Sequence, residues 1–91
     1  RVVIKDDIVL TVGTGNDLQI YHDGTNSYIE NATGNLHISS STSDGDILFS
    51  VNDGGTILEA LKIDASSGGD LVLPNDDQNF HMGAGSDLSM L

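Results

Sequence analysis

The 91-residue sequence contains no cysteine and no tryptophan, a single proline, and only three lysine or arginine residues. The absence of cysteine excludes disulfide bonds, thiolate metal sites and cysteine nucleophiles. The scarcity of cations excludes the clustered positive charge that binding to a nucleic-acid backbone requires. No apolar run approaches membrane-spanning length. We therefore expect no nucleic-acid partner and no membrane insertion.

The composition favours turns and leaves little material for a core. Eleven glycines accompany many serine, threonine, asparagine and aspartate residues, and 14 acidic residues give a formal net charge of −11. Only 37% of the residues are hydrophobic and 4% are aromatic. A chain of this size is marginally stable by itself even with an ordinary composition. These numbers predict a turn-rich protein that depends on contacts with something else.

Short runs of alternating apolar residues follow glycine-containing turns along the whole chain, and such runs are typical of β-strands. No window has a sustained helical period. The segment Thr56–Ile63 ("TILEALKI") is ambiguous, but we interpret it as the return strand of a hairpin that turns at Asn52–Gly55. The sequence therefore predicts an all-β fold. The runs are "GNDLQI", "GNLHI", "GDILFSV", "GGTILEALKI", "GGDLVL" and "GSDLSM".

The two ends of the chain are similar to each other. When residues 1–21 are aligned with residues 71–91, seven of the 21 positions are identical, including Asp6-Asp7 with Asp76-Asp77. Self-similarity at a fixed period indicates a repeat architecture. We expect residues 1–70 to form one complete repeat and residues 71–91 to begin the next. Because the chain starts at Arg1 and not at Met, we also expect it to be a fragment of a longer protein.

The stretch Tyr21-His22-Asp23-Gly24 ("YHDG") brings together residue types that occur in small binding sites. Asp-Gly, however, is a strong hairpin turn signature, because glycine tolerates the positive φ that tight turns require. We interpret the stretch mainly as a corner of β-structure, with His22 packed at a strand end.

Other candidate sites have weak support from residue spacing. Asp17 in "VGTGNDLQI" is a candidate calcium ligand, but the motif lacks the tandem nonapeptide repetition of calcium-binding β-rolls. His22 is a candidate ion ligand if three chains bring three copies of it together. No nucleophile–base–acid set and no cofactor fingerprint is complete, so we predict no catalytic residue, no resident cofactor and no enzyme activity.

The string "GTGNDLQIYHDGTNSYIENATGNLHI" resembles the repeated modules of tail-fibre and related structural proteins of bacteriophages, especially marine and cyanobacterial phages. "GDILFSVNDGGTILEALKIDASSGGDLVL" resembles the same proteins, so the resemblance covers nearly the whole chain. In the second copy Leu91 stands where the pattern has tyrosine.

This resemblance implies a virion structural role outside the cell, as a shaft or spacer of an elongated fibre that can contribute to adhesion. It implies an intertwined homotrimeric β-fibre, in which narrow apolar stripes from three chains meet on a common axis. If the segment touches a host cell-surface glycan, the expected contacts are Tyr21, Asp23, Asn26 and Tyr28. The residues expected in the assembly core are Val12, Leu18, Ile20, Leu36, Ile38, Phe49 and Val51.

Two alternatives belong to other classes. One is a secreted calcium- or carbohydrate-binding module with a single-chain β-solenoid fold, which would need calcium or the ligand but no second chain. The other is a fragment of a depolymerase that cuts host surface polysaccharide, which would need a pair of catalytic carboxylates.

Overall fold

A computed structural model describes residues 1–85, and the chain divides into two compact units, one from Arg1 to Ile38 and one that begins at Ser39. Each unit contains one three-stranded antiparallel sheet. Among the described residues there is no α-helix, and the short 3₁₀ turn η1 (Ala65–Ser67) is the one helical element. The predicted all-β fold is confirmed. Most of the predicted strand Gly85–Met90, with Asp87 and Leu91, lies outside the described residues.

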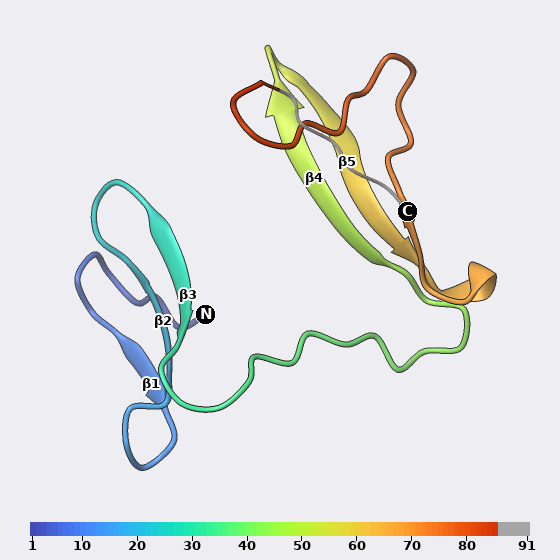
Figure 1. Cartoon of the computed structure of the whole chain (residues 1–91). Helices are drawn as coiled ribbons and strands as arrows, with labels where there is room; N and C mark the ends of the chain where they lie inside the picture. Colours follow the sequence, from blue (N-terminus) through green and yellow to red (C-terminus); the bar gives the residue numbers. More distant parts are fainter. Residues whose placement is uncertain (86–91) are drawn as a thin grey trace. The chain divides into compact units, whose positions relative to one another are not determined.

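The first sheet consists of β1 (Leu10–Val12), β2 (Leu18–His22) and β3 (Ser27–Asn31) in that order (Figure 1). The four residues after β2 form the corner predicted from Asp23-Gly24, and the N–H of Asp23 donates to the carbonyl of Asn26 at 3.0 Å. Because β2 pairs with a strand on each side, it sets the register of the whole sheet.

The register places apolar and polar side chains on opposite faces of the first sheet, since successive residues of a strand point to opposite sides. Ile20 is opposite Leu10 on one side and Ile29 on the other. The apolar face, named here face 1, consists of Leu10, Val12, Leu18, Ile20 and Ile29, with His22 and Ser27 at one end and Asn31 at the other. The other face consists of Thr11, Gln19, Tyr21, Tyr28 and Glu30.

The predicted strand at Leu36–Ile38 is absent, and no strand occurs between Ala32 and Asp46. Leu36 and Ile38 are 46% and 61% exposed. The run is short and is followed by five consecutive serine or threonine residues, so no neighbouring strand is available to pair with its backbone. Ile8 lies before β1 and belongs to no strand.

The second sheet consists of β4 (Ile47–Asp53), β5 (Thr56–Asp64) and β6 (Asp70–Val72), with β5 in the centre. Gly54 and Gly55 join β4 to β5 with φ values of 61° and 103°, a pair of positive angles that suits a tight hairpin turn. The side-chain oxygen of Asn52 accepts the N–H of Gly55 at 2.7 Å. The interpretation of "TILEALKI" as a return strand is confirmed.

A β-bulge at Ala60 explains why apolar residues of this strand, Leu58 and Leu61, have a three-residue spacing that also occurs in helices. Phe49 is opposite Leu61 and the next residue, Ser50, is opposite Glu59, so Ala60 has no partner on β4. The extra residue reverses the alternation and brings Leu58 to the same side as Leu61, three positions away. The resulting apolar face, named here face 2, consists of Ile47, Phe49, Val51, Leu58, Leu61, Ile63 and Leu71, with Asp53 and Thr56 at its turn end.

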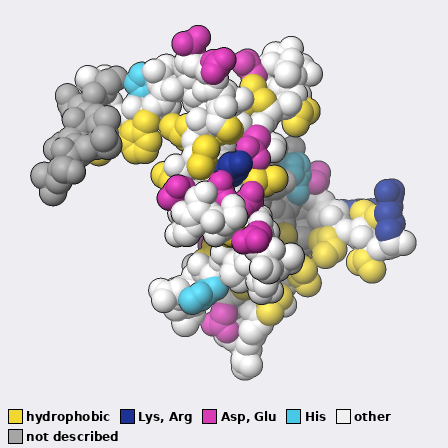
Figure 2. All heavy atoms as spheres, turned by 90° about the vertical axis from the view of Figure 1, so that its right-hand side faces the viewer, with side chains coloured by type: hydrophobic (Ala, Val, Ile, Leu, Met, Phe, Trp, Pro, Cys, Tyr) yellow, Lys and Arg dark blue, Asp and Glu magenta, His cyan; other side chains and the backbone are white. Residues whose placement is uncertain are grey.

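Within residues 1–85, neither unit contains a hydrophobic core. No apolar side chain among the described residues is buried, and Phe49, Val51 and Ile29 are 46%, 51% and 64% exposed. Figure 2 shows hydrophobic side chains at the molecular surface, next to acidic ones. Each sheet thus carries an apolar face that the chain leaves largely uncovered.

The Gly54 position gives a direct test of the hairpin. We expect Gly54→Val to lower the free energy of unfolding by about 1–2 kcal/mol, because a β-branched residue is strained at positive φ. Gly54→Asn is the control and should change it by less than about half of that, since asparagine tolerates the left-handed region. Urea unfolding followed by circular dichroism measures both. Equal losses in the two variants would contradict the proposed turn geometry.

Candidate functional site

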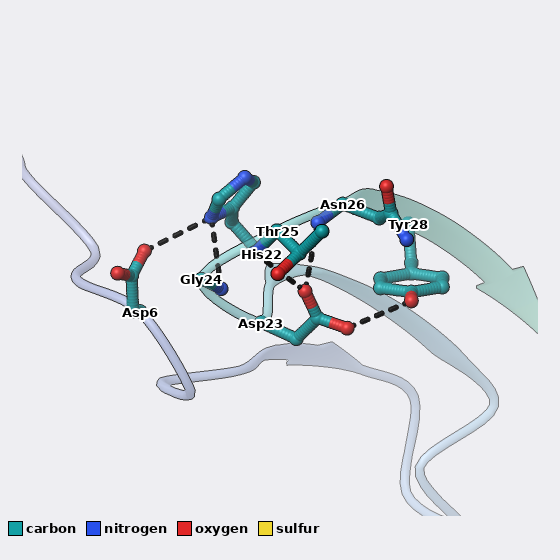
Figure 3. A network of polar contacts seen from close by, with 7 residues as sticks. All are labelled: Asp6, His22, Asp23, Gly24, Thr25, Asn26 and Tyr28. Atoms are coloured by element: carbon teal, nitrogen blue, oxygen red, sulfur yellow. Dashed lines mark hydrogen bonds and ion pairs between the residues drawn. The ribbon is translucent and has the colours of Figure 1, made fainter.

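The densest network of polar side chains lies at the corner between β2 and β3 (Figure 3). It joins the predicted "YHDG" stretch to an N-terminal residue that the sequence did not associate with it. The residues of this corner network are Asp6, His22, Asp23, Gly24, Thr25, Asn26 and Tyr28.

Asp23 is the centre of the corner. Its Oδ1 accepts the backbone N–H groups of Thr25 at 2.9 Å and Asn26 at 2.7 Å, and its Oδ2 accepts the hydroxyl of Tyr28 at 2.8 Å. These bonds, led by the one from Asn26, stabilise the ionised carboxylate and lower its pKa from 3.8 to about 2. Asp23 is therefore used to close the turn, as the corner interpretation predicts.

His22 is held at the end of face 1 by the N-terminal segment. Its Nδ1 lies 2.9 Å from Oδ1 of Asp6 and 3.1 Å from the N–H of Gly24, while its carbonyl accepts the N–H of Asp7 at 2.8 Å. A protonated Nδ1 donates to Asp6, and an unprotonated one accepts from Gly24. In either form the ring is engaged within the chain. The His22 and Asp6 side chains are 42% and 65% exposed, so their ion pair adds little stability.

Asp6, His22 and Ser27 are the residue types of a hydrolytic triad, since Ser27 is opposite His22 in the register. Their geometry is different. A triad needs a hydrogen bond from the serine hydroxyl to the imidazole, and within residues 1–85 no such bond joins Ser27 to His22. We assign no catalytic role to these residues.

Tyr21 and Tyr28 form a cross-strand pair on the polar face of the first sheet. Their rings stack with centroids 4.8 Å apart and planes 20° apart. The hydroxyl of Tyr21 donates to Glu30 at 3.1 Å, and this bond raises the pKa of Tyr21. Both hydroxyls are thus bound to carboxylates of the same chain. Glu30 was not predicted in this cluster, although strand alternation places it on the face of Tyr28.

The four predicted glycan contacts differ in how accessible their polar groups are to a ligand. Tyr21, Asp23 and Tyr28 lie together, but the carboxylate of Asp23 is occupied by the turn. Asn26 contributes its backbone N–H to Asp23 and is exposed. The outer surfaces of the rings and the Asn26 amide are the groups that a ligand could contact.

Asp17, the candidate calcium ligand, closes a different turn. Its Oδ2 accepts the N–H of Gly15 at 3.3 Å, and its carbonyl accepts the N–H of Ala32 at 2.8 Å. A Cβ atom added to Gly13, whose φ is 95°, would lie 2.3 Å from the same carboxylate oxygen. Among residues 1–85 no group of three or more His, Cys, Asp or Glu side chains could hold a metal ion. In the same part of the chain, no helix is long and apolar enough to span a bilayer.

An open hollow of about 580 Å³ lies on the first unit, mainly over face 1. Half of its lining residues are aliphatic, and the others are a histidine, a serine and two tyrosines at the end nearest the corner. Such a surface suits apolar side chains better than a charged ligand. The lining residues are Ile4, Leu10, Ile20, Tyr21, His22, Ser27, Tyr28 and Ile29.

The pKa of Asp23 tests the corner network. We expect the folded chain to lose the stability contributed by Asp23 as the pH falls from about 4 towards 2, because the folded-state pKa of about 2 lies below the ordinary value of 3.8. Tyr28→Phe should raise this pKa, since it removes one bond to the carboxylate. Tyr21→Phe is the matched control and should leave it unchanged, because Tyr21 bonds to Glu30. An NMR titration of the Asp23 carboxyl carbon gives this pKa in the unchanged chain and in both variants. An equal shift in the two variants would contradict the network.

Comparison of the chain with models of protein families, with curated proteins and with solved structures gave no significant match. The support for a function therefore comes from the sequence pattern and from the geometry described above.

Proposed function

We propose that this chain is a structural segment of a bacteriophage tail fibre or a similar virion appendage, in which three copies associate through faces 1 and 2. The segment acts as a shaft or spacer outside the cell. The observation that carries the proposal is that each sheet gathers most of its aliphatic residues on one face, while no apolar side chain of the described residues is buried.

The exposed area of the chain supports an assembly. The chain exposes 7559 Å². A compact monomer of its 9.5 kDa mass would expose about 5,000 Å², and two separate bodies of half that mass would together expose about 6,100 Å². The excess over the larger estimate is about 1,500 Å², which is the scale of surface that stable protein interfaces bury.

The composition of the two faces makes another copy of the chain a suitable partner. Face 1 contains no lysine, arginine, aspartate or glutamate, and the register of the described strands places one such residue on face 2, Asp53 at the turn end of β4. Identical faces can therefore meet around a symmetry axis with few like charges together, although the whole chain carries a charge of −11. A basic protein partner would bind the acidic side chains on the sides of the sheets opposite to faces 1 and 2, and both apolar faces would remain uncovered.

The other two classes have less support. The coils of a β-solenoid stack parallel strands, whereas every pair of neighbouring strands here is antiparallel. Asp17, the candidate calcium ligand, closes a turn. A depolymerase would need two carboxylates across a substrate cleft, and the hollow of the first unit has no carboxylate in its lining.

A contribution to host adhesion would use the opposite side of the first sheet. With face 1 in the assembly, the stacked rings of Tyr21 and Tyr28 point outward, and aromatic rings next to amide and carboxylate groups suit a glycan. Substitution of Tyr21 and Asn26 by alanine tests this part: reduced adsorption of virions to host cells supports it, and unchanged adsorption contradicts it.

Adjacent residues of β4 provide the test of the assembly. We expect multi-angle light scattering of the 91-residue chain to give the mass of three copies, with or without a calcium chelator. Phe49→Asp should abolish the association, because it places a charge on face 2. Leu48→Asp should preserve it, because Leu48 is on the other side of the same strand and is already 56% exposed. A folded monomer, or an equal effect of both substitutions, would contradict the proposal.

A further inference from the structure

The turn Asn75–Gln78 follows β6 and holds the central strand of the second sheet. The N–H of Gln78 donates to the carbonyl of Asn75 at 3.3 Å, and Asp77 has a φ of 60°. The side-chain amide of Asn75 donates to the carbonyl of Glu59 at 2.8 Å, and that of Gln78 donates to the carbonyl of Ala60 at 2.5 Å.

These two amides replace a strand. β6 ends at Val72, and Pro74, which cannot donate a backbone hydrogen bond, follows two residues later. The edge of β5 beside the Ala60 bulge therefore lacks a neighbouring strand, and the amides of Asn75 and Gln78 satisfy its carbonyls. In this way the turn is fixed to the sheet that precedes it.

The same turn occurs 70 residues earlier, where it is fixed to the sheet that follows it. The N–H of Ile8 donates to the carbonyl of Lys5 at 3.1 Å, and Asp7 has a φ of 63°. Here the outward groups are the carboxylate of Asp6, 2.9 Å from Nδ1 of His22, and the N–H of Asp7, 2.8 Å from the carbonyl of His22.

The two sets of contacts use different positions of one turn. The first and fourth residues, Asn75 and Gln78, bind the preceding sheet, whereas the second and third residues, Asp6 and Asp7, bind the following sheet. Asp76 and Asp77 have the identities of Asp6 and Asp7. Within residues 1–85 the Asp76 carboxylate and the Asp77 N–H have no hydrogen-bond partner. Among these residues, both groups are unpaired while the amides of Asn75 and Gln78 are engaged.

We propose that the Asn75–Gln78 turn is a two-sided joint between consecutive sheets of the repeat, and that its second partner is a further copy of the β1–β3 sheet placed in register behind it. This inference rests on the repeating fibre proposed above. In the joint, the carboxylate of Asp76 and the N–H of Asp77 bind the counterpart of His22 in the next copy. The turn therefore fixes the position of each sheet to the next through main-chain and side-chain hydrogen bonds.

A tandem chain provides the test. Residues 22–91 are added directly after Leu91, so that a copy of His22 follows in the register of the repeat, and this chain is compared with the 91-residue chain. We expect the Asp77 amide to exchange its hydrogen rapidly in the single chain and to be protected in the tandem chain, as the Asp7 amide is in both. Equal exchange of the Asp77 amide in the two chains would overturn the joint.

Substitutions separate the two sides of the turn. Asp76→Ala should reduce the folding equilibrium constant of the tandem chain by up to about fivefold, the upper end of the effect of an exposed ion pair, and should leave the single chain unchanged. Gln78→Ala is the matched control and should destabilise both chains, because its partner Ala60 is present in both. An effect of Asp76→Ala that is the same in both chains would overturn the joint. Trimers by light scattering, together with an equal effect of Asp76→Ala in both chains, would contradict the joint alone. Monomers, together with an effect of Asp76→Ala in the tandem chain only, would contradict the assembly alone.

Discussion

The structure depends on one constraint: each sheet has an apolar face, and within residues 1–85 neither unit supplies a second layer of its own to cover it. A stable domain normally places two layers around a shared core, but each unit here supplies one layer of three strands. Backbone hydrogen bonds join the three strands of each sheet, while its apolar face remains largely exposed. An isolated sheet of this size is close to the lower limit of stability, and the association proposed above would cover both faces.

Polar side chains partly compensate for the missing hydrophobic core by forming hydrogen bonds that fix the backbone at the turns. Asp23, Asn52 and Asp46 each accept backbone N–H groups, at the β2–β3 corner, at the β4–β5 turn and beside Ala65. Asp17 does the same for Gly15. Such bonds restrict the strand ends to one geometry and so fix the register between strands. Many of the acidic and amide residues that look like ligands in the sequence are therefore part of the scaffold.

The sequence predicted what depends on neighbouring residues. The Asp23-Gly24 corner, the hairpin at Gly54-Gly55 and the strand nature of Thr56–Ile63 follow from local turn chemistry and alternation, and they are present. Leu36–Ile38 has the same local pattern, but a strand also needs a neighbour, and none pairs with it. A period of two residues cannot indicate whether a pairing partner exists elsewhere in the chain.

Features that depend on distant residues were not predicted. The contact of Asp6 with His22 joins residues 16 positions apart, and the Gln78 amide reaches Ala60 from 18 positions away. The bulge was also hidden, because Leu58 and Leu61 share a face only after Ala60 is taken out of the alternation. Within the candidate site, the sequence found the residues of the corner but not the N-terminal segment that closes it.

The net charge and the apolar faces act over different distances, and this difference favours a single alignment in the proposed assembly. Chains with a charge of −11 repel one another at separations up to about 8–10 Å in physiological salt, whereas apolar surfaces attract only on contact. In the proposed assembly, an alignment in which each face fully overlaps its copies in the other chains would bury the most apolar area against this repulsion. A shifted alignment would keep the repulsion, bury less apolar surface and bring acidic turns against an apolar face. Strong charge of one sign would therefore favour the register that buries the most apolar surface.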